Sequence, residues 1–132
     1  MNANIQKFVY AILASPEWAA LGLQTTTSDS PVTDARKLPY AEVTILGGQA
    51  TARNASLERS VMNAAVILDM YVKKPQGQLE LAVLSDRASD VLGQRRSVDG
   101  RSRTSACSYF YVGLDPADPS LVRGTIRCSV QH

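Results

Sequence analysis

Four arginines in one short segment form the densest group of residues in the chain that can bind a charged partner. Arg95, Arg96, Arg101 and Arg103 lie within QRRSVDGRSR, residues 94–103. A guanidinium group donates paired hydrogen bonds to phosphates and to carboxylates, so the segment fits a nucleic acid or an acidic protein surface. A solvated loop is the third interpretation. Because no aromatic residue is interleaved with these arginines, a protein partner or a solvated loop is favoured over nucleic acid.

Two aspartates on the helix before this segment offer an acidic counterpart. Asp86 and Asp90 lie four positions apart, where like charges destabilise an isolated helix by about 0.2–0.5 kcal/mol. Arg87 is close enough in sequence to compensate them within one subunit. The pair therefore marks either a solvated helix surface or an acidic face. In an oligomer these carboxylates would meet the arginines of a neighbouring subunit.

Residue types that carry catalysis or bind metals are sparse and scattered. The single histidine is His132, at the chain end, where a Ser-His or Cys-His pair would lack a fixed position. Cys107 and Cys128 fall in consecutive expected strands and can lie close together as reduced thiols. One histidine and two separated cysteines do not build a structural zinc site. Gly47-Gly48 lacks the lysine and the spacing of a phosphate-binding loop. We therefore expect no enzyme, no metal and no cofactor.

Three tyrosines and one aspartate are candidate contact residues on strands. Tyr71 and Asp69 belong to the half-apolar side of the expected strand Leu57–Lys73, and Tyr109 and Tyr111 share one side of a later strand. Tyrosine is enriched at interfaces because it combines a large apolar ring with a polar tip. We expect these side chains to point outward as interface anchors. Cross-strand packing within the subunit is the alternative.

Hydrophobic periodicity predicts two main helices and about four strands. Apolar residues at helical spacing indicate an N-terminal helix over Asn2–Ala14 and a central helix over Gly77–Leu92. Ser15-Pro16 is typical of the start of a further short helical turn. The expected strands are Pro39–Leu46, Leu57–Lys73, Thr104–Val112 and Leu121–Val130. This order predicts an α+β domain with a mixed or antiparallel sheet, packed by the two helices.

The apolar positions also predict which faces are buried. On Leu57–Lys73, every second residue from Met62 to Val72 is apolar and forms the expected core face. The other face is half apolar, so we expect another subunit to cover it. The central helix should end at Gly93, and its expected buried stripe is Leu79, Val83, Leu84, Ala88, Val91 and Leu92.

Polar segments separate these elements. Gln24–Lys37 is expected to be a loop, and Gln49–Ser56 a second loop after Gly47-Gly48 ends its strand. The segment Gln94–Arg103 has Asp99-Gly100 near its centre, so it either extends a hairpin or is a mobile connection.

Length and composition fit one domain over residues 1–132. Hydrophobic residues make up 45% and charged residues 20%, the balance of a chain that buries a core. The formal net charge of +2 is too small to indicate nucleic-acid binding by itself. No apolar run reaches the roughly 20 residues of a membrane-spanning helix. The apolar Phe8–Ala14 precedes Ser-Pro-Glu-Trp rather than a small-residue cleavage site, so we expect a docking helix there and no signal peptide.

The elements also carry local sequences in a characteristic order. An N-terminal helix is followed by LPYAEV at Leu38–Val43 and by a long strand that ends ILDMYV at Ile67–Val72. A Lys/Pro/Gly turn leads into LSDRASDVL at Leu84–Leu92, and the last strand is VRGTIRCSV at Val122–Val130. This layout resembles the tail terminator (tail completion) proteins of long-tailed bacteriophages over residues 4–130. Other small neck and tail proteins share the arrangement.

The resemblance implies a subunit of a hexameric ring in the virion, at the tail and neck, assembled in the host cytoplasm. Such rings sit on the last ring of tail tube protein, stop its polymerisation and present a surface to the head connector or head-closure protein. The resemblance implies no active site, no cofactor and no membrane, with DNA only passing through the lumen. The alternatives are another head–tail neck protein, and a small nucleic-acid-binding adaptor that uses the arginine segment 94–103.

Overall fold

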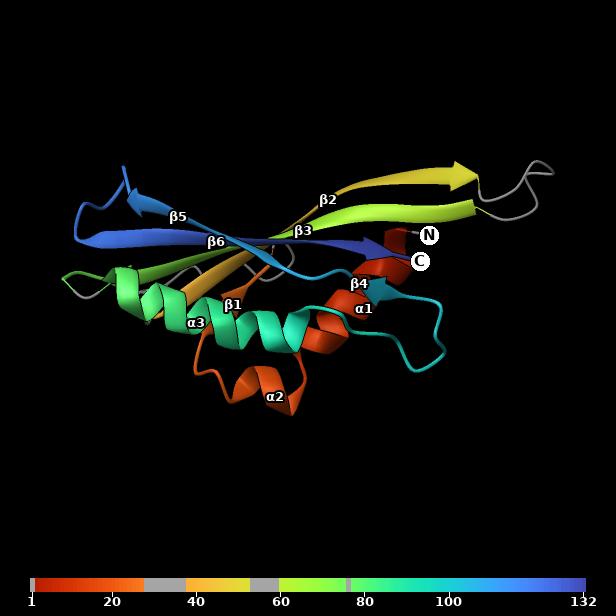
Figure 1. Ribbon diagram of the computed structural model, residues 1–132, viewed down its shortest axis with the longest axis horizontal. Helices are drawn as coiled ribbons and strands as arrows, with labels where there is room; N and C mark the ends of the chain where they lie inside the picture. Colours follow the sequence, from red (N-terminus) through yellow and green to blue (C-terminus); the bar gives the residue numbers. More distant parts are fainter. Residues whose placement is uncertain (1, 28–37, 53–59, 76) are drawn as a thin grey trace.

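A mixed sheet with its helices on one face makes up the fold, which confirms the α+β prediction (Figure 1). The computed structural model describes residues 2–27, 38–52, 60–75 and 77–132. In chain order the elements are α1 (Asn2–Leu13), α2 (Pro16–Ala19), β1 (Gln24–Thr26), β2 (Tyr40–Ala52), β3 (Ser60–Lys73), α3 (Gly77–Leu92), β4 (Arg103–Thr104), β5 (Ser108–Leu114) and β6 (Leu121–Gln131).

The described sheet has six strands, where about four were predicted. Its order is β1-β2-β3-β6, and both β4 and β5 pair with the far side of β6; only the β1–β2 pair is parallel. The predicted strand Thr104–Val112 divides because its register shifts. Thr104 lies opposite Val130, whereas Ser108 lies opposite Arg127, so four steps on one strand match three on the other. One extra residue interrupts the pairing there.

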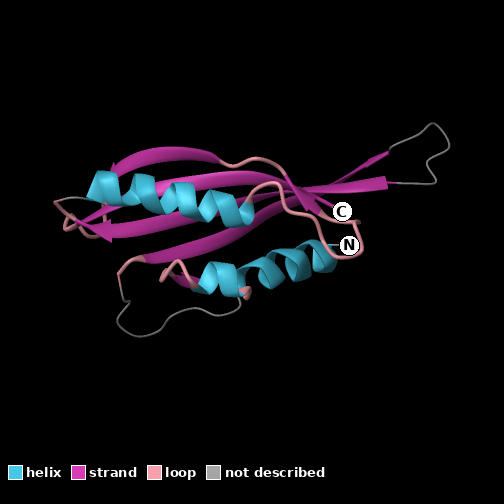
Figure 2. Ribbon diagram, turned by 60° about the horizontal axis from the view of Figure 1, so that its bottom comes forward, coloured by secondary structure: helices cyan, strands magenta, loops and turns pink. Residues whose placement is uncertain are grey.

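Helices α1 and α3 lie side by side on the same face of the sheet (Figure 2). The predicted apolar face of α1 is confirmed, because Ile5, Val9 and Ile12 are buried in the main core. The short helix α2 begins as predicted: the Ser15 hydroxyl accepts a hydrogen bond from the Trp18 backbone N–H at 3.3 Å. The alternation on β3 is confirmed from Ala64 onward, and its core-facing residues are Ala64, Val66, Leu68, Met70 and Val72.

Strands β2 and β3 together extend beyond the rest of the sheet. The prediction that Gly47-Gly48 ends its strand is wrong: β2 continues to Ala52, with a register shift between Gly47 and Gln49. Gly47 takes a φ of +84°, which a glycine adopts without strain and which allows the irregularity. The pairing with β6 stops at Asn63, so among the described strands only β2 pairs with residues 60–62 of β3. The end of the hairpin is therefore a two-stranded arm.

Both predicted polar loops begin inside strands. Gln24–Thr26 forms β1, which pairs in parallel with the start of β2. Residues 28–37 of the first predicted loop and 53–59 of the second lie outside the described residues.

Helix α3 has the predicted bounds but a partly different buried face. Its buried stripe runs from Leu81 through Leu84, Ser85 and Ala88 to Leu92, while Leu79 and Val83 are 71% and 50% exposed. The predicted stripe was misplaced because the buried side of the helix includes a polar residue, Ser85. The Ser85 hydroxyl donates to the Ala82 carbonyl oxygen at 2.8 Å, so it is buried without an unsatisfied donor.

Helix α3 ends immediately before Gly93, as predicted, but Gly93 does not supply the left-handed backbone that often follows a helix. The residue with left-handed backbone is Gln94, with a φ of +53°, and not Gly93. Gly93 instead lets Cys107 pack closely against the end of the helix, because a Cβ at position 93 would lie 3.2 Å from the Cys107 Sγ atom. The helix therefore stops at a point where the next segment packs against it.

Replacing Gly77 by alanine should destabilise the fold. A Cβ at Gly77 would lie 2.1 Å from the Cγ2 atom of the buried Val122, so the start of α3 must shift. We expect a loss of about 1–3 kcal/mol in the free energy of unfolding, measured by urea denaturation. Gln78→Ala is the matched control on the same exposed turn and should stay within about 0.5 kcal/mol of the parent. Equal stabilities for both variants would contradict this packing.

Candidate functional site

The arginine segment is an ordered hairpin at the end of α3, which confirms the first of its two predicted forms. Backbone hydrogen bonds join Thr104 N to Arg95 O and Ser97 N to Ser102 O, both at 2.8 Å. Gly100 turns the chain with a φ of +73°. The Asp99 carboxylate accepts from the Ser97 hydroxyl and from the Arg101 backbone N–H, which lowers the pKa of Asp99. The tip is thus held by its own polar groups.

A buried threonine fixes this hairpin to the helix. The Thr104 hydroxyl donates to the Leu92 carbonyl oxygen at 2.7 Å and accepts from the Arg95 backbone N–H at 2.8 Å. Leu92 is the last residue of α3, where helix carbonyls lack an intrahelical donor, and Arg95 belongs to the first strand of the hairpin. One side chain therefore caps α3 and positions the hairpin.

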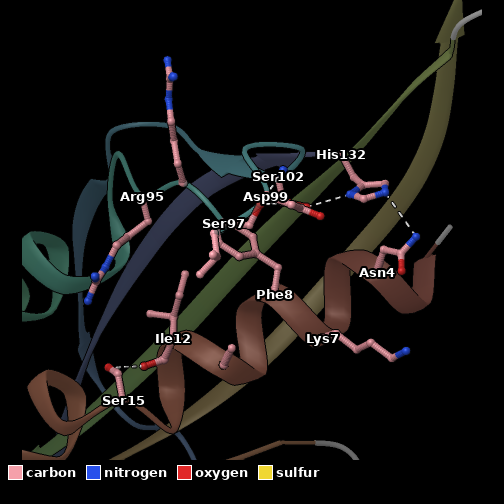
Figure 3. A pocket seen from close by; sticks show the side chains of 13 residues that line it. Asn4, Lys7, Phe8, Ile12, Ser15, Arg95, Ser97, Asp99, Ser102 and His132 are labelled. Atoms are coloured by element: carbon pink, nitrogen blue, oxygen red, sulfur yellow. Dashed lines mark hydrogen bonds between the residues drawn. The ribbon is translucent and has the colours of Figure 1, made fainter.

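The structure brings His132 to a serine, a pairing that the sequence argument judged unfavourable. The Ser102 Oγ atom lies 2.7 Å from His132 Nδ1, and Asn4 Nδ2 lies 3.1 Å from Nε2 (Figure 3). With the Asn4 amide donating to Nε2, a neutral His132 carries its proton on Nδ1 and donates it to Ser102. That direction is opposite to the one a nucleophilic serine needs. Ser102 is also 3% exposed, so the trio ties α1, the hairpin and the chain end together.

The four arginines do not act as one group. Arg95 is half-buried, donates from Nε to the Val91 carbonyl oxygen at 2.8 Å and lies 3.8 Å from the Glu17 carboxylate. Arg103 donates from Nε to the Gln131 side-chain oxygen at 3.0 Å. The side chains of Arg96 and Arg101 are exposed, and within the described part of the chain neither forms an ion pair. Only the last two are therefore free for a partner.

A pocket of about 540 Å³ separates the hairpin from α1 (Figure 3). Phe8 and Ile12 of α1 line it on one side, and the hairpin, including Val98, lines the other. Val98 is fully exposed at the hairpin tip. An apolar side chain in that position has no cover from its own subunit.

The predicted acidic pair lies on the exposed side of α3. Asp86 and Asp90 are exposed, and no ion pair to either is found among the residues that the structure describes. The expected compensation by Arg87 is absent there, because its Nη2 atom donates to the Ala20 carbonyl oxygen at 3.2 Å. Within the described ranges, Asp86 and Asp90 form no ion pair with Arg96 or Arg101.

The three candidate tyrosines do not form one outward surface, so the prediction that all three point outward is wrong. Tyr71 is 7% exposed and stacks on Tyr40 across the strand pair, with ring centroids 4.7 Å apart. Burial raises the pKa of the Tyr71 hydroxyl, and a hydrogen bond with the Arg123 guanidinium partly offsets that rise. Both rings gain cross-strand packing on the helix-free face.

The other two tyrosines face the helix side of the sheet. Tyr109 lies opposite Ile126 and packs against the core, with its ring over Gly124, where a Cβ would lie 2.8 Å from the ring. Tyr111, two residues on, is 42% exposed. Cross-strand packing, the alternative stated for these residues, explains Tyr71 and Tyr109, and only Tyr111 keeps substantial free surface.

Asp69 is engaged within the sheet. It lies between Glu42 and Thr125 on the helix-free face, and its carboxylate accepts from the Thr125 hydroxyl at 2.6 Å. This hydrogen bond explains how a half-buried carboxylate is accommodated in the centre of the sheet. Asp69 therefore has a structural role in the subunit.

Strand β5 carries an exposed apolar surface that the sequence argument did not single out. Phe110, Val112 and Leu114 are 57%, 48% and 53% exposed, and β5 pairs only with β6 among the described strands. In the run YFYVGL, apolar and aromatic residues occupy successive positions, so the sequence itself indicates that both faces of this strand are apolar. Its position at an edge of the sheet is a property of the topology, so it is not visible in the local sequence.

The predicted neighbourhood of the two cysteines is confirmed. Both thiols are free, and the register that pairs Ser108 with Arg127 sets Cys107 against Cys128. A hydrogen bond between the thiols lowers the pKa of Cys107 and raises that of Cys128. In the described parts of the chain, no three His, Cys, Asp or Glu residues gather to hold a metal ion. Nor does any helix described here have the length and apolarity to cross a membrane.

A comparison with known protein-family models finds no match to this chain, and a comparison with curated proteins finds none either. The functional argument therefore rests on the surfaces themselves. They are the free edge of β5, the hairpin tip with its free arginines, and the exposed side of α3.

Replacing Thr104 by valine should release the hairpin from α3. The change keeps the side-chain shape but leaves the buried Leu92 carbonyl and Arg95 N–H without their partner, at a cost of about 1–3 kcal/mol. We expect faster amide hydrogen exchange over residues 94–103 and lower stability. Ser108→Ala, at an exposed position, is the control. Unchanged exchange in Thr104→Val would show that the hairpin is held by other contacts.

Proposed function

We propose that this chain is a structural subunit of a phage virion that assembles into a closed ring, caps the tail tube, ends its polymerisation and joins the tail to the head connector. The observation that supports it most is the exposed apolar edge of β5. The element order that resembles tail terminator proteins gives the ring its biological setting.

The free edge of β5 can pair with a strand, or be covered by a surface, of another chain. Natural proteins protect edges with charges, proline or a covering element, because an open apolar edge pairs with other chains. Strand β5 contains no charged residue and no proline and exposes Phe110, Val112 and Leu114, and the one irregularity in its pairing with β6 is the register shift between Tyr111 and Gly113. An apolar edge of this kind is typical of an assembly interface.

Strand directions favour a ring as the way to cover it. Each of the pairs β2–β3, β3–β6 and β6–β5 is antiparallel, so β5 runs opposite to β2 and to the parallel β1. Copies that follow one another in the same orientation along the sheet keep these strand directions. The β5 edge of one copy would then meet the β1–β2 edge of the next in an antiparallel sense, and repeated contacts of this head-to-tail kind close into a ring.

The two-stranded arm supports the same proposal. An isolated pair of strands is marginally stable in water, and beyond Asn63 the arm has no third described strand. A neighbouring subunit or the tail tube would supply the missing contact.

Lysine substitutions in β5 should abolish assembly. In Phe110→Lys/Val112→Lys, two ammonium groups stand on the apolar edge, so we expect the parent to form a species several times 14.3 kDa and the variant to remain monomeric. Light scattering over a concentration series, alone and with tail tube protein, measures this. Ala3→Lys/Gln6→Lys adds the same charge on exposed positions of α1 and is the control.

Two outcomes would contradict the proposed function. One is a parent chain that stays monomeric at high concentration and when mixed with tail tube protein. The other is a parent that shifts DNA in a salt-dependent way and loses this when Arg96 and Arg101 become serine, which would favour the nucleic-acid adaptor. Negative-stain images of capped tubes of uniform length would support the tail role.

A further inference from the structure

We propose that the Val98 hairpin tip of one copy docks into an apolar groove beside α3 of the next copy, with Arg96 and Arg101 facing Asp86 and Asp90. This inference rests on the proposed ring and identifies a second contact in it, separate from the β5 edge.

The hairpin tip is an apolar knob between two cationic side chains. Val98 is fully exposed, and the free Arg96 and Arg101 stand on either side of the turn. The one described carboxylate at the tip, Asp99, accepts hydrogen bonds from the Ser97 hydroxyl and from the Arg101 backbone N–H and keeps its negative charge. Two arginines against one carboxylate leave the tip with a net positive charge.

The groove is an apolar hollow of about 450 Å³ beside the first half of α3. Leu21 and Leu84 are buried in its floor, while Leu79 and Val83 stand exposed on its wall. These last two residues are the ones that the sequence pattern assigned to the core. An exposed leucine and valine one turn apart, next to a hollow, form a site for an apolar side chain.

The acidic residues continue the same side of the helix. Leu79, Val83, Asp86 and Asp90 follow each other at spacings of four, three and four residues, which places them in one stripe. Glu80 also lines the groove, and the one cation there, Arg87, donates to the Ala20 carbonyl oxygen. The groove and stripe thus present net negative charge and match the positive tip.

One subunit does not bring these two surfaces together by itself. The hairpin leaves the C-terminal end of α3 and lies beside α1, while the groove is centred on Val83, about 13 Å from Leu92 by the rise of the helix. A second copy of this chain carries both the knob and the groove. A knob that fits a hollow elsewhere on the same molecule makes a head-to-tail contact, as a ring requires.

Two charge-reversed variants test this contact when they are mixed. In Arg96→Glu/Arg101→Glu the tip becomes acidic, and in Asp86→Arg/Asp90→Arg the stripe becomes basic; each alone places like charges at every junction. We expect each variant alone to self-associate about tenfold or more weakly than the parent. Mixed in equal amounts they restore opposite charges at every junction, so assembly should return with the two variants alternating. Sedimentation velocity and native mass spectrometry measure this.

Further variants separate charge from packing and from folding. Lys73→Glu/Lys74→Glu has the same charge change as the reversed tip at exposed positions outside both surfaces, and it should assemble like the parent. Val98→Asp should weaken assembly and Val98→Ile should preserve it. Circular dichroism establishes that each variant is folded.

The outcomes distinguish this inference from the proposed function. A parent that forms rings while both reversed variants also form them shows that the hairpin does not touch α3 of a neighbour, and the ring proposal stands. Reversed variants that fail alone and fail when mixed also overturn the pairing. A parent that remains monomeric with and without tail tube protein overturns the contact and the ring together.

Discussion

One-sided burial of the sheet is the constraint on which the rest of the structure depends. Both α1 and α3 lie on the same face, so Val66, Leu68 and Met70 of β3 are buried under them while Ile67 and Asp69, between them, are half-buried on the other face. Most of the apolar burial therefore lies on the helix side, and the helix-free face holds the smaller cluster of Tyr40, Tyr71 and Leu121. Every remaining surface must be stabilised by local pairing or be covered by another molecule.

The helix-free face is stabilised largely by contacts within the subunit. Tyr40 and Tyr71 stack, and Asp69 accepts the Thr125 hydroxyl hydrogen bond, so the middle of this face is filled by cross-strand pairs. Cover of that face of β3 by a second subunit stays a prediction. The uncovered features lie at the sheet edge of β5, the two-stranded arm and the hairpin tip, and it is there that assembly contacts are proposed.

Sequence patterns correctly predicted the features that depend on a few neighbouring residues. The bounds of α3, the core face of β3 and the Ser15 cap follow from periodicity and capping, which act within a few residues. The errors concern side chains whose environment depends on how the elements pack together. Ser85 is buried because the Ala82 carbonyl accepts its proton, and Leu79 is exposed because Leu81 takes the place against the sheet. The same holds for the arginines: sequence alone groups Arg95 with Arg96, but Glu17 and Val91 engage only the first.

That division among the arginines also bears on what would hold a ring together. Exposed ion pairs are worth only about 0–1 kcal/mol each, so Arg96 and Arg101 opposite two aspartates would add little to the strength of a junction. Burial of Phe110, Val112 and Leu114 on the β5 edge would be worth more, at about 25 cal/mol per Å² of apolar surface. Non-directional burial does not by itself choose an orientation, whereas charges do. The apolar edge would therefore hold the subunits together, and the hairpin and α3 would decide which side of a neighbour each subunit accepts.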